Sequence, residues 1–293
     1  MKLHSPSQLI TFIDSPYASW YDRANREKPE MFSEMKDEED KLQSVLQTKG
    51  FEHEKKILEE FKKKKLKIVE NVEFGAVATA IMDGVDVIYQ AKLTTERFCG
   101  DADFIVKEDG EYVIYDTKLA RQVKPYMIYQ LCIYTEALGL ILGEMPKVFK
   151  VITGTGEIVT HRTMDYFHYF KAVERDFLAF HEQFDINKPP KAEDYSSHGS
   201  WSEHAEAELI KKDHLSLIAN ITRKNIKTFE AFGINTVQHL IEAKFDPKFR
   251  MEQEIFEKLK LQADLQRKSV LLEVPLFKIK KDINIPPKSS EDL

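Results

Sequence analysis

The sequence predicts an α/β domain followed by a smaller domain built only from helices. Residues 66–117 hold short runs of β-branched and aromatic residues between turn residues, a pattern typical of strands. Residues 37–64 and 124–142, on either side, carry apolar residues at helical spacing. After residue 200 the pattern is helical throughout. These observations indicate a sheet flanked by helices in the first two thirds of the chain.

Length and charge support a division into two units. At roughly 150 residues per domain, 293 residues correspond to about two domains. A stretch at 186–200 that contains Pro and Ser is the best candidate for a linker. The first 185 residues carry 25 basic and 32 acidic side chains, whereas residues 186–293 carry 18 and 17. We therefore expect domains at 1–185 and 201–268, with 269–293 as a tail or a junction to a further domain.

The elements of the first domain are expected in the following order. Ser5 caps a first helix, and Pro16 keeps that helix short. Residues 37–64 form one long helix or two shorter ones. This region ends in a lysine run that we interpret as a solvated helix end, with phosphate binding as the alternative. A helix at 124–142 and an aromatic helix at 163–183 come later. The expected strands are Lys67–Phe74, Val85–Ala91, Ala102–Lys107, Tyr112–Thr117, Val148–Thr153 and Glu157–His161.

Composition excludes several classes of protein. Cys99 and Cys132 are the two cysteines, too few for a disulfide scaffold or an all-cysteine metal site within this chain. No apolar run reaches the ~20 residues of a membrane span, and the N-terminus lacks the apolar core of a signal peptide. The expected location is therefore the cytoplasm. A net charge of −6 excludes a histone-like binder but not a nucleic-acid enzyme, because metal sites need carboxylates.

One hairpin concentrates charged side chains. Asp109-Gly110 between two strand-like runs predicts a two-residue turn. The register then places Asp103 opposite Asp116, with their Cβ atoms about 4.5–5.5 Å apart. Lys118 lies two residues further along the strand, so its side chain points to the same face as that of Asp116.

Two opposed carboxylates repel each other, and this repulsion favours a compensating cation between them. Oxygen ligands suit Mg²⁺ or Mn²⁺, so the hairpin predicts a divalent metal site. Lys118 would orient a water molecule or stabilise charge that develops on phosphate oxygens. The alternative is an Asp–Lys ion pair at the protein surface, which leaves the opposed Asp103 without an explanation.

Four short patterns in the first domain occur in the same order in a known nuclease family. They are Gly50-Phe51-Glu52-His53, Gly100-Asp101-Ala102-Asp103, Asp116-Thr117-Lys118 and Gln130-Leu131-Cys132-Ile133-Tyr134. Together they resemble the Gly-x-x-His, Gly-x-x-Asp, Asp-x-Lys and Gln-x-x-x-Tyr motifs of PD-(D/E)XK nucleases of the RecB-like branch. The resemblance implies a PD-(D/E)XK, restriction-endonuclease-like core, in which a mixed central sheet is flanked by helices.

The resemblance also implies roles for individual residues. The implied catalytic residues are Asp103, Asp116, Lys118, Gln130 and Tyr134. The implied ligands of Mg²⁺ or Mn²⁺ are His53, Asp103, Asp116 and the carbonyl of Thr117. Two basic residues after the Asp-x-Lys motif, Arg121 and Lys124, are expected to contact nucleic acid. Alternatively, His53 is an ordinary helix residue, and Gln130 and Tyr134 form a polar edge of a packing face. Asp101 is a competing carboxylate beside Asp103.

The wider resemblance covers nearly the whole chain. In the bacterial proteins that it resembles, a RecB-like nuclease precedes an exonuclease-like domain and often a superfamily 1 helicase. Residues 285–293 resemble the junction to that second domain, so we expect an N-terminal part of a longer protein. Many relatives hold a four-iron, four-sulfur cluster. Because Ser15 and residues 198–205 stand at the cysteine positions, we expect no iron–sulfur cluster, and packing around Trp20 and Trp201 to join the two ends.

The C-terminal helices contain a second candidate site. Gly233 fits the position after one helix, and Thr236 fits the N-cap of the next. This pattern resembles a helix-hairpin-helix unit, which binds the DNA backbone through amides at a helix N-terminus. Nearby basic residues would add phosphate contacts, namely Arg223, Lys224 and Lys227. The alternative is an ordinary helical hairpin that packs against the first domain.

The sequence therefore predicts a metal-dependent deoxyribonuclease, a hydrolase of phosphodiester bonds in DNA repair, recombination or defence. Its expected partner is DNA, as single strands or as duplex ends. Two alternatives remain. One is a catalytically silent DNA-binding or docking module of a larger helicase-nuclease. The other is an RNA-processing nuclease, since nothing in the sequence distinguishes a 2′-hydroxyl.

Overall fold

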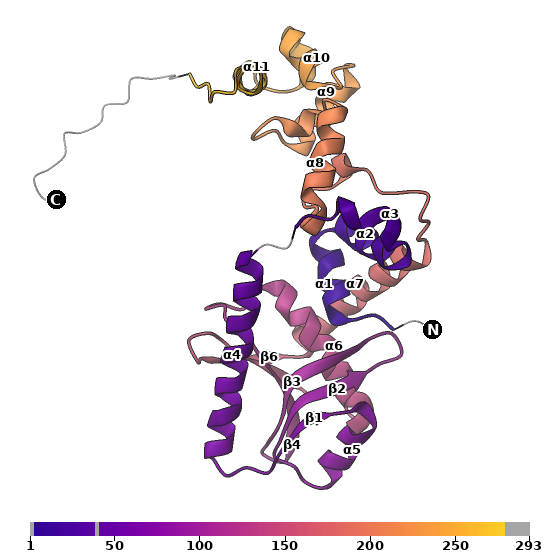
Figure 1. Cartoon of the computed structure of the whole chain (residues 1–293), viewed down its shortest axis with the longest axis vertical. Coiled ribbons are helices and arrows are strands. Elements are labelled where there is room, and N and C mark those ends of the chain that lie inside the picture. The colour runs from indigo at the N-terminus through magenta and orange to yellow at the C-terminus, as the bar shows by residue number, and fades with distance from the viewer. Residues whose placement is uncertain (1–2, 39–40, 279–293) are drawn as a thin grey trace, which may run out of the picture. The chain divides into compact units, whose positions relative to one another are not determined.

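The computed structural model describes residues 3–38 and 41–278 and divides into two compact units, Met1–His204 and Ala205–Leu293 (Figure 1). The first unit contains a six-stranded mixed sheet flanked by helices, and the second is helical. This confirms the expected α/β class. The division between the units lies at His204, so residues 186–200 belong to the first unit.

The sheet has its strands in chain order, from β1 to β6. Two neighbouring pairs are parallel, β1 with β2 and β4 with β5, and the other pairs are antiparallel. Parallel neighbours need a crossover, which the helices α5 and α6 provide. The strands are β1 Ile68–Val72, β2 Val87–Thr94, β3 Cys99–Glu108, β4 Glu111–Thr117, β5 Val148–Ile152 and β6 Ile158–Arg162.

The structure places helices at the expected 37–64, 124–142 and 163–183, as α4, α6 and α7, and adds α2, α3 and α5, for which the sequence analysis gave no bounds. Ser5 caps α1 in a capping box with Gln8, and Ser15 caps α2, whose first residue is Pro16. The lysine run forms the solvated end of α4, where Lys62 is ion-paired with Glu59. The helices are α1 Pro6–Asp14, α2 Pro16–Glu27, α3 Pro29–Phe32, α4 Lys41–Lys63, α5 Phe74–Met82, α6 Pro125–Leu142 and α7 Met164–Glu182, with 3-10 turns η1 Ser33–Met35, η2 Ala192–Asp194 and η3 Gly199–Trp201.

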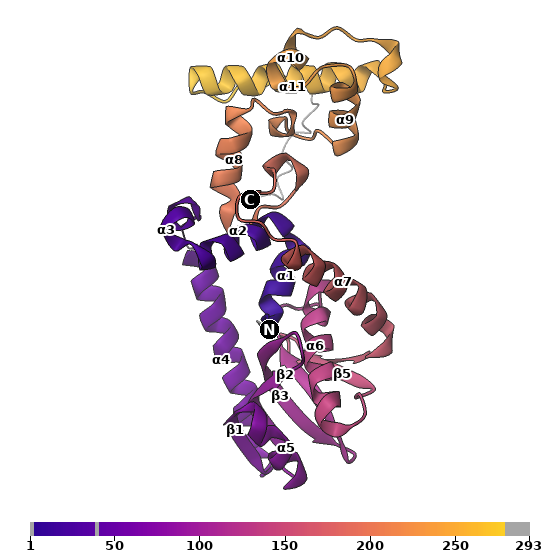
Figure 2. The same ribbon diagram turned by 90° about the vertical axis from the view of Figure 1, so that its right-hand side faces the viewer.

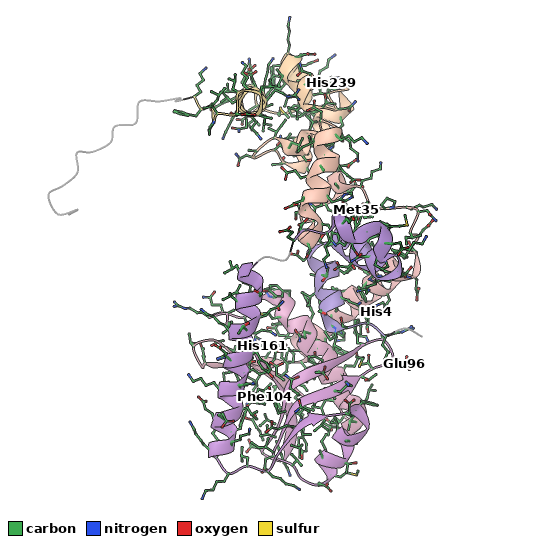
Figure 3. All side chains as sticks on the ribbon, in the orientation of Figure 1. His4, Met35, Glu96, Phe104, His161 and His239 are labelled. Carbon is green, nitrogen blue, oxygen red and sulfur yellow. The ribbon has the colours of Figure 1, made fainter. Side chains whose placement is uncertain are left out.

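Helices cover both faces of the sheet (Figures 1 and 2). On one face α4 packs Ile57 and Leu58 against strand residues that include Phe104, which Figure 3 labels between α4 and the sheet. On the other face α1, α5, α6 and α7 form a larger core with the opposite side chains of the strands. Both α4 and α6 contact β4, the strand that contains residue 116.

The helix α5 corrects the sequence prediction. The expected strand Lys67–Phe74 ends at Val72, and Phe74 begins a helix instead. Its composition, with Ala76, Ala78 and Ala80 among apolar residues, is compatible with either element. The crossover between the parallel strands β1 and β2 decides in favour of the helix.

The second unit has its own apolar core, built around Phe229, Phe249 and Phe256. Gly233 has a left-handed φ of 77° directly after α9, and Thr236 caps α10, so both predicted capping roles are confirmed. Helix α8, Ser202–Lys211, begins at the end of the first unit and continues into the second, which also contains η4 Leu215–Leu217, α9 Arg223–Ala231, α10 Val237–Glu242, η5 Pro247–Phe249 and α11 Gln253–Leu272. Residues 285–293, the expected junction, lie outside the described residues. Among the described helices, none combines the length and the apolar composition that a bilayer crossing requires.

Candidate active site

The predicted hairpin register is confirmed. Glu108 pairs with Glu111, and the ladder between β3 and β4 continues to Phe104 and Tyr115. The turn residues Asp109 and Gly110 both have positive φ, 49° and 87°, as a two-residue hairpin turn requires. The tight turn therefore fixes which strand residues face each other at the far end of the hairpin.

Beyond this ladder the side chain of Asp103, and not its backbone, forms the hydrogen bonds to β4. Its Oδ2 accepts hydrogen bonds from the amide of Thr117 at 2.8 Å and from the hydroxyl of Thr117 at 2.9 Å. The expected pairing of Asp103 with Asp116 is not formed, because the ladder ends at Phe104 and Tyr115 and Asp103 bonds to Thr117 instead. Two donors hold the Asp103 carboxylate against β4, where strand pairing gives way to side-chain contacts.

Asp116 is almost completely buried, with 1% of its surface exposed. Lys118 Nζ lies 2.8 Å from its Oδ2 and 3.1 Å from its Oδ1, so the two side chains share one face as predicted. Burial raises the pKa of Asp116 to about 7; the like charges of Asp103 and Glu54 add to this, and Lys118 opposes it. Burial by itself would lower the pKa of Lys118, but the carboxylates of Asp116 and Asp103 keep it above its ordinary value.

Glu54 is a site residue that the sequence reasoning did not identify. It follows His53 on α4, is 9% exposed, and accepts a hydrogen bond from the side-chain amide of Gln90 on β2. Burial raises the pKa of Glu54, and the negative charge of Asp103 raises it further. Three acidic side chains from α4, β3 and β4 therefore lie within each other's electrostatic influence, with Lys118 as the neighbouring cation.

The backbone of the sheet is distorted on β1 and β2, in the row of residues that runs across these strands to Asp103 of β3. Gln90 has a φ of 52° and Asn71 a φ of 55°, values that non-glycine residues rarely adopt inside strands. Tyr89 and Ala91 each pair with β3, whereas Gln90 and Asp103 between them do not. Left-handed non-glycine residues cost roughly 1–3 kcal/mol and cluster at functional sites. The distortion accompanies the hydrogen bond from Gln90 to Glu54.

Helix α6 closes the other side of the site. Burial raises the pKa of Tyr134, and the negative charges of Asp116, Asp103 and Asp101 raise it further. Gln130 Nε2 lies 3.4 Å from Tyr134 Oη. The hydrogen bond between them lowers the pKa of Tyr134. A Cβ atom on Gly100 would lie 3.0 Å from the same hydroxyl, so close packing against Tyr134 explains why a glycine stands at this position.

The remaining predicted residues differ in how closely they join the cluster. His53 Nε2 is buried and has no hydrogen-bond partner, while the neighbouring Glu54 makes the contacts to the sheet. Thr117 contacts Asp103 through its amide and hydroxyl. Arg121 and Lys124 are exposed in the connection between β4 and α6, directly after Lys118.

The side chains of this site are chemically suited to bind a hard divalent cation. Carboxylate oxygens are the ligands that Mg²⁺ and Mn²⁺ prefer, and the buried Asp116 Oδ2 has Lys118 Nζ at 2.8 Å as its ion-pair partner. Among the described residues, no three His, Cys, Asp or Glu side chains are placed closely enough to hold a metal ion. Instead, Asp103 contacts Thr117 and Asp116 contacts Lys118. A bound cation would therefore have to replace the contacts of Asp103 with Thr117 and of Asp116 with Lys118.

A basic groove lies on the second unit. It has a volume of about 1070 Å³ and is lined by the predicted Arg223, Lys224 and Lys227 of α9 together with Lys248 and Arg250 at η5. Its lining also includes the 43% exposed ring of Phe232 and contains no acidic residue. Lys248 and Arg250 are separated from α9 in the sequence, so the helical pattern did not reveal them.

The amide groups at the start of α10 are used within the chain. Val237 donates to the carbonyl of Asp213 at 2.8 Å, and Gln238 donates to the Asp213 carboxylate at 2.9 Å. His239 donates to the hydroxyl of Thr236 at 3.0 Å. The amides that the helix-hairpin-helix resemblance expected to bind phosphate are therefore already engaged within the chain.

Comparisons with protein-family models, with curated proteins and with solved structures give no match for this chain.

Proposed function

We propose that this chain is a metal-dependent nuclease of the PD-(D/E)XK class, similar to the RecB-like branch. The observation that carries the proposal is the cluster of Asp103, Asp116 and Lys118 at the end of the confirmed hairpin. A surface ion pair does not account for it, because Asp116 is buried and two further acidic side chains act on it.

In this proposal Asp103 and Asp116 hold Mg²⁺ or Mn²⁺, with His53 and the carbonyl of Thr117 as the further expected ligands. The ion, when bound, polarises the scissile phosphodiester and lowers the pKa of a water molecule. Lys118 supplies positive charge where the attacked phosphate becomes more negative. Gln130 and Tyr134 orient the site or the DNA backbone.

The basic groove supports nucleic acid as the substrate class. Five cationic side chains line this groove and provide the sequence-independent attraction that a phosphate backbone requires. The exposed ring of Phe232 offers a surface on which an unpaired base can stack. DNA is the proposed substrate, in repair, recombination or defence.

Cleavage of end-labelled single- and double-stranded DNA tests the proposal. We expect products with Mn²⁺ or Mg²⁺ and none with EDTA, and the product ladder separates terminal from internal cleavage. An RNA competitor of the same sequence tests the RNA-processing alternative. DNA binding without products in either metal would contradict the nuclease and favour the silent docking module.

A further inference from the structure

The first unit contains a second polar cavity that shares no lining residue with the hairpin site. Its volume is about 210 Å³. The N-terminal segment, α2, the turn between β2 and β3, and α7 all contribute to its wall. Figure 3 labels His4 at this place, close to α1. The polar side chains of the lining are His4, Gln8, Arg23, Arg26, Arg97, His181 and Glu182.

The cavity has an excess of positive charge. Three guanidinium groups line it, from Arg23, Arg26 and Arg97, against the single carboxylate of Glu182. Clefts lined mainly by one sign of charge concentrate the electrostatic potential and attract ligands of the opposite sign. The planar guanidinium fork matches the oxygens of phosphate and carboxylate groups.

Arg23 of α2 is held in position. Arg23 Nε lies 2.9 Å from a carboxylate oxygen of Glu27, and a second nitrogen donates to the carbonyl of His181. The guanidinium of Arg23 also lies 4.1 Å from the ring centre of Phe184. Arg26 is three residues further along α2, so it shares the face of Arg23. A ligand would therefore meet in Arg23 a donor that is already ordered.

His181 supplies the second, independent observation. Its side chain is 5% exposed and lines the cavity, yet its Nδ1 has no hydrogen-bond partner. Its Nε2 lies 3.2 Å from the hydroxyl of Ser19. If that hydroxyl donates, Nδ1 carries the hydrogen and lacks an acceptor. An unsatisfied buried donor costs about 1–3 kcal/mol, which an oxyanion in the cavity would recover.

We propose that this cavity binds a phosphate group through Arg23, Arg26, Arg97 and the Nδ1–H of His181. Its volume of about 210 Å³ suits a small anion, since pockets for drug-sized ligands measure roughly 300–1,000 Å³. The phosphate is either free or carried at the end of a nucleic-acid strand, and the second source rests on the proposed function. Arg97 is six residues before Asp103, at most about 20 Å along the chain, so one short strand can reach both.

Inorganic phosphate is the first probe, measured by thermal unfolding of the full chain in a buffer without phosphate. We expect millimolar phosphate to raise the unfolding temperature of the wild type. Arg26→Ala removes an exposed arginine and should abolish this rise. Arg175→Ala, an exposed arginine on α7 outside the lining, should retain it. The same rise in Arg26→Ala, or no rise in the wild type, would overturn the proposal.

Oligonucleotides separate the two sources of phosphate. Binding to strands with a 5′-phosphate, a 3′-phosphate or only hydroxyl ends is measured in EDTA. We expect one phosphorylated strand to bind about tenfold more tightly, and Arg26→Ala to reduce this ratio to about one. Equal binding of all three strands would overturn the strand-end source. Phosphate binding without any DNA cleavage would leave the cavity standing and contradict the nuclease, and cleavage without phosphate binding would do the reverse.

Discussion

At the residue scale, the hairpin site depends on which side chains partner its carboxylates. Asp103, Asp116 and Lys118 could be predicted from the sequence, because the turn at Asp109-Gly110 fixes the register and strands alternate every two residues. Glu54 could not be predicted in the same way. Its contact with Gln90 depends on how α4 lies across the sheet, which is a long-range property.

Gln90 is expected to stabilise the site through Glu54. Gln90→Ala keeps a non-glycine residue at the left-handed position and removes the donor to a buried carboxylate. We therefore expect a loss of about 1–3 kcal/mol in the free energy of unfolding, measured in urea without metal at pH 8. Gln47→Ala, at an exposed position of α4, should change it by less than about 0.5 kcal/mol. Equal effects of the two variants would contradict the role of Gln90.

At the scale of elements, the junction of α1 and α2 ties the N-terminus to residues near 200. The hydroxyl of Ser15 accepts from the amide of Ala18 at 3.0 Å and donates to the carbonyl of Ser197 at 2.6 Å. Trp201 is fully buried, donates to Asp22 at 3.0 Å, and packs on the ring of Tyr21. The aromatic packing that we expected between the two ends is present.

Removal of the Ser15 hydroxyl tests this junction. Ser15→Ala loses the cap of α2 and leaves a carbonyl in a partly buried place without its donor. We expect about 1–3 kcal/mol of destabilisation, measured by chemical unfolding. Ser7→Ala, whose exposed hydroxyl lies 2.8 Å from that of Ser5, is the matched control and should be nearly neutral. An unchanged stability of Ser15→Ala would show that the aromatic packing alone holds the junction.

Elements were predictable where periodicity and end signals agree. The hairpin strands and α6 follow from alternation, the Asp-Gly turn and the early Pro125. The helix α5 was missed because a short apolar run of nine residues carries no decisive period. The distortion at Gln90 has no sequence signal either, and Asn71 gives only a weak one, because asparagine tolerates a positive φ without requiring it.

At the scale of the whole molecule, positive charge gathers in two places although the net charge is −6. One is the arginine-lined cavity of the first unit, and the other is the groove of the second unit. Net charge alone therefore says little about nucleic-acid binding by this chain. The groove was only partly predictable, because α9 displays its basic residues in one run whereas Lys248 and Arg250 join it through folding.

The salt dependence of DNA binding tests the groove. Lys248→Ala removes one cation from its lining, so affinity should fall for all sequences, and the slope of log K against log salt should decrease by about 1. Lys211→Ala removes an exposed lysine of α8 outside the lining and should leave the slope unchanged. Identical slopes for the wild type and Lys248→Ala would exclude this groove as the DNA contact.

The most direct test of the nuclease is a comparison of two Asp→Asn variants in one hairpin. Asp116→Asn removes the buried carboxylate, whereas Asp109→Asn changes the turn at the other end and keeps a residue that tolerates positive φ. Cleavage of end-labelled DNA is measured in Mn²⁺, with circular dichroism as a check of folding. We predict that Asp116→Asn abolishes cleavage and keeps its fold, and that Asp109→Asn cleaves like the wild type. Undiminished cleavage by a folded Asp116→Asn variant would contradict the assignment of the active site.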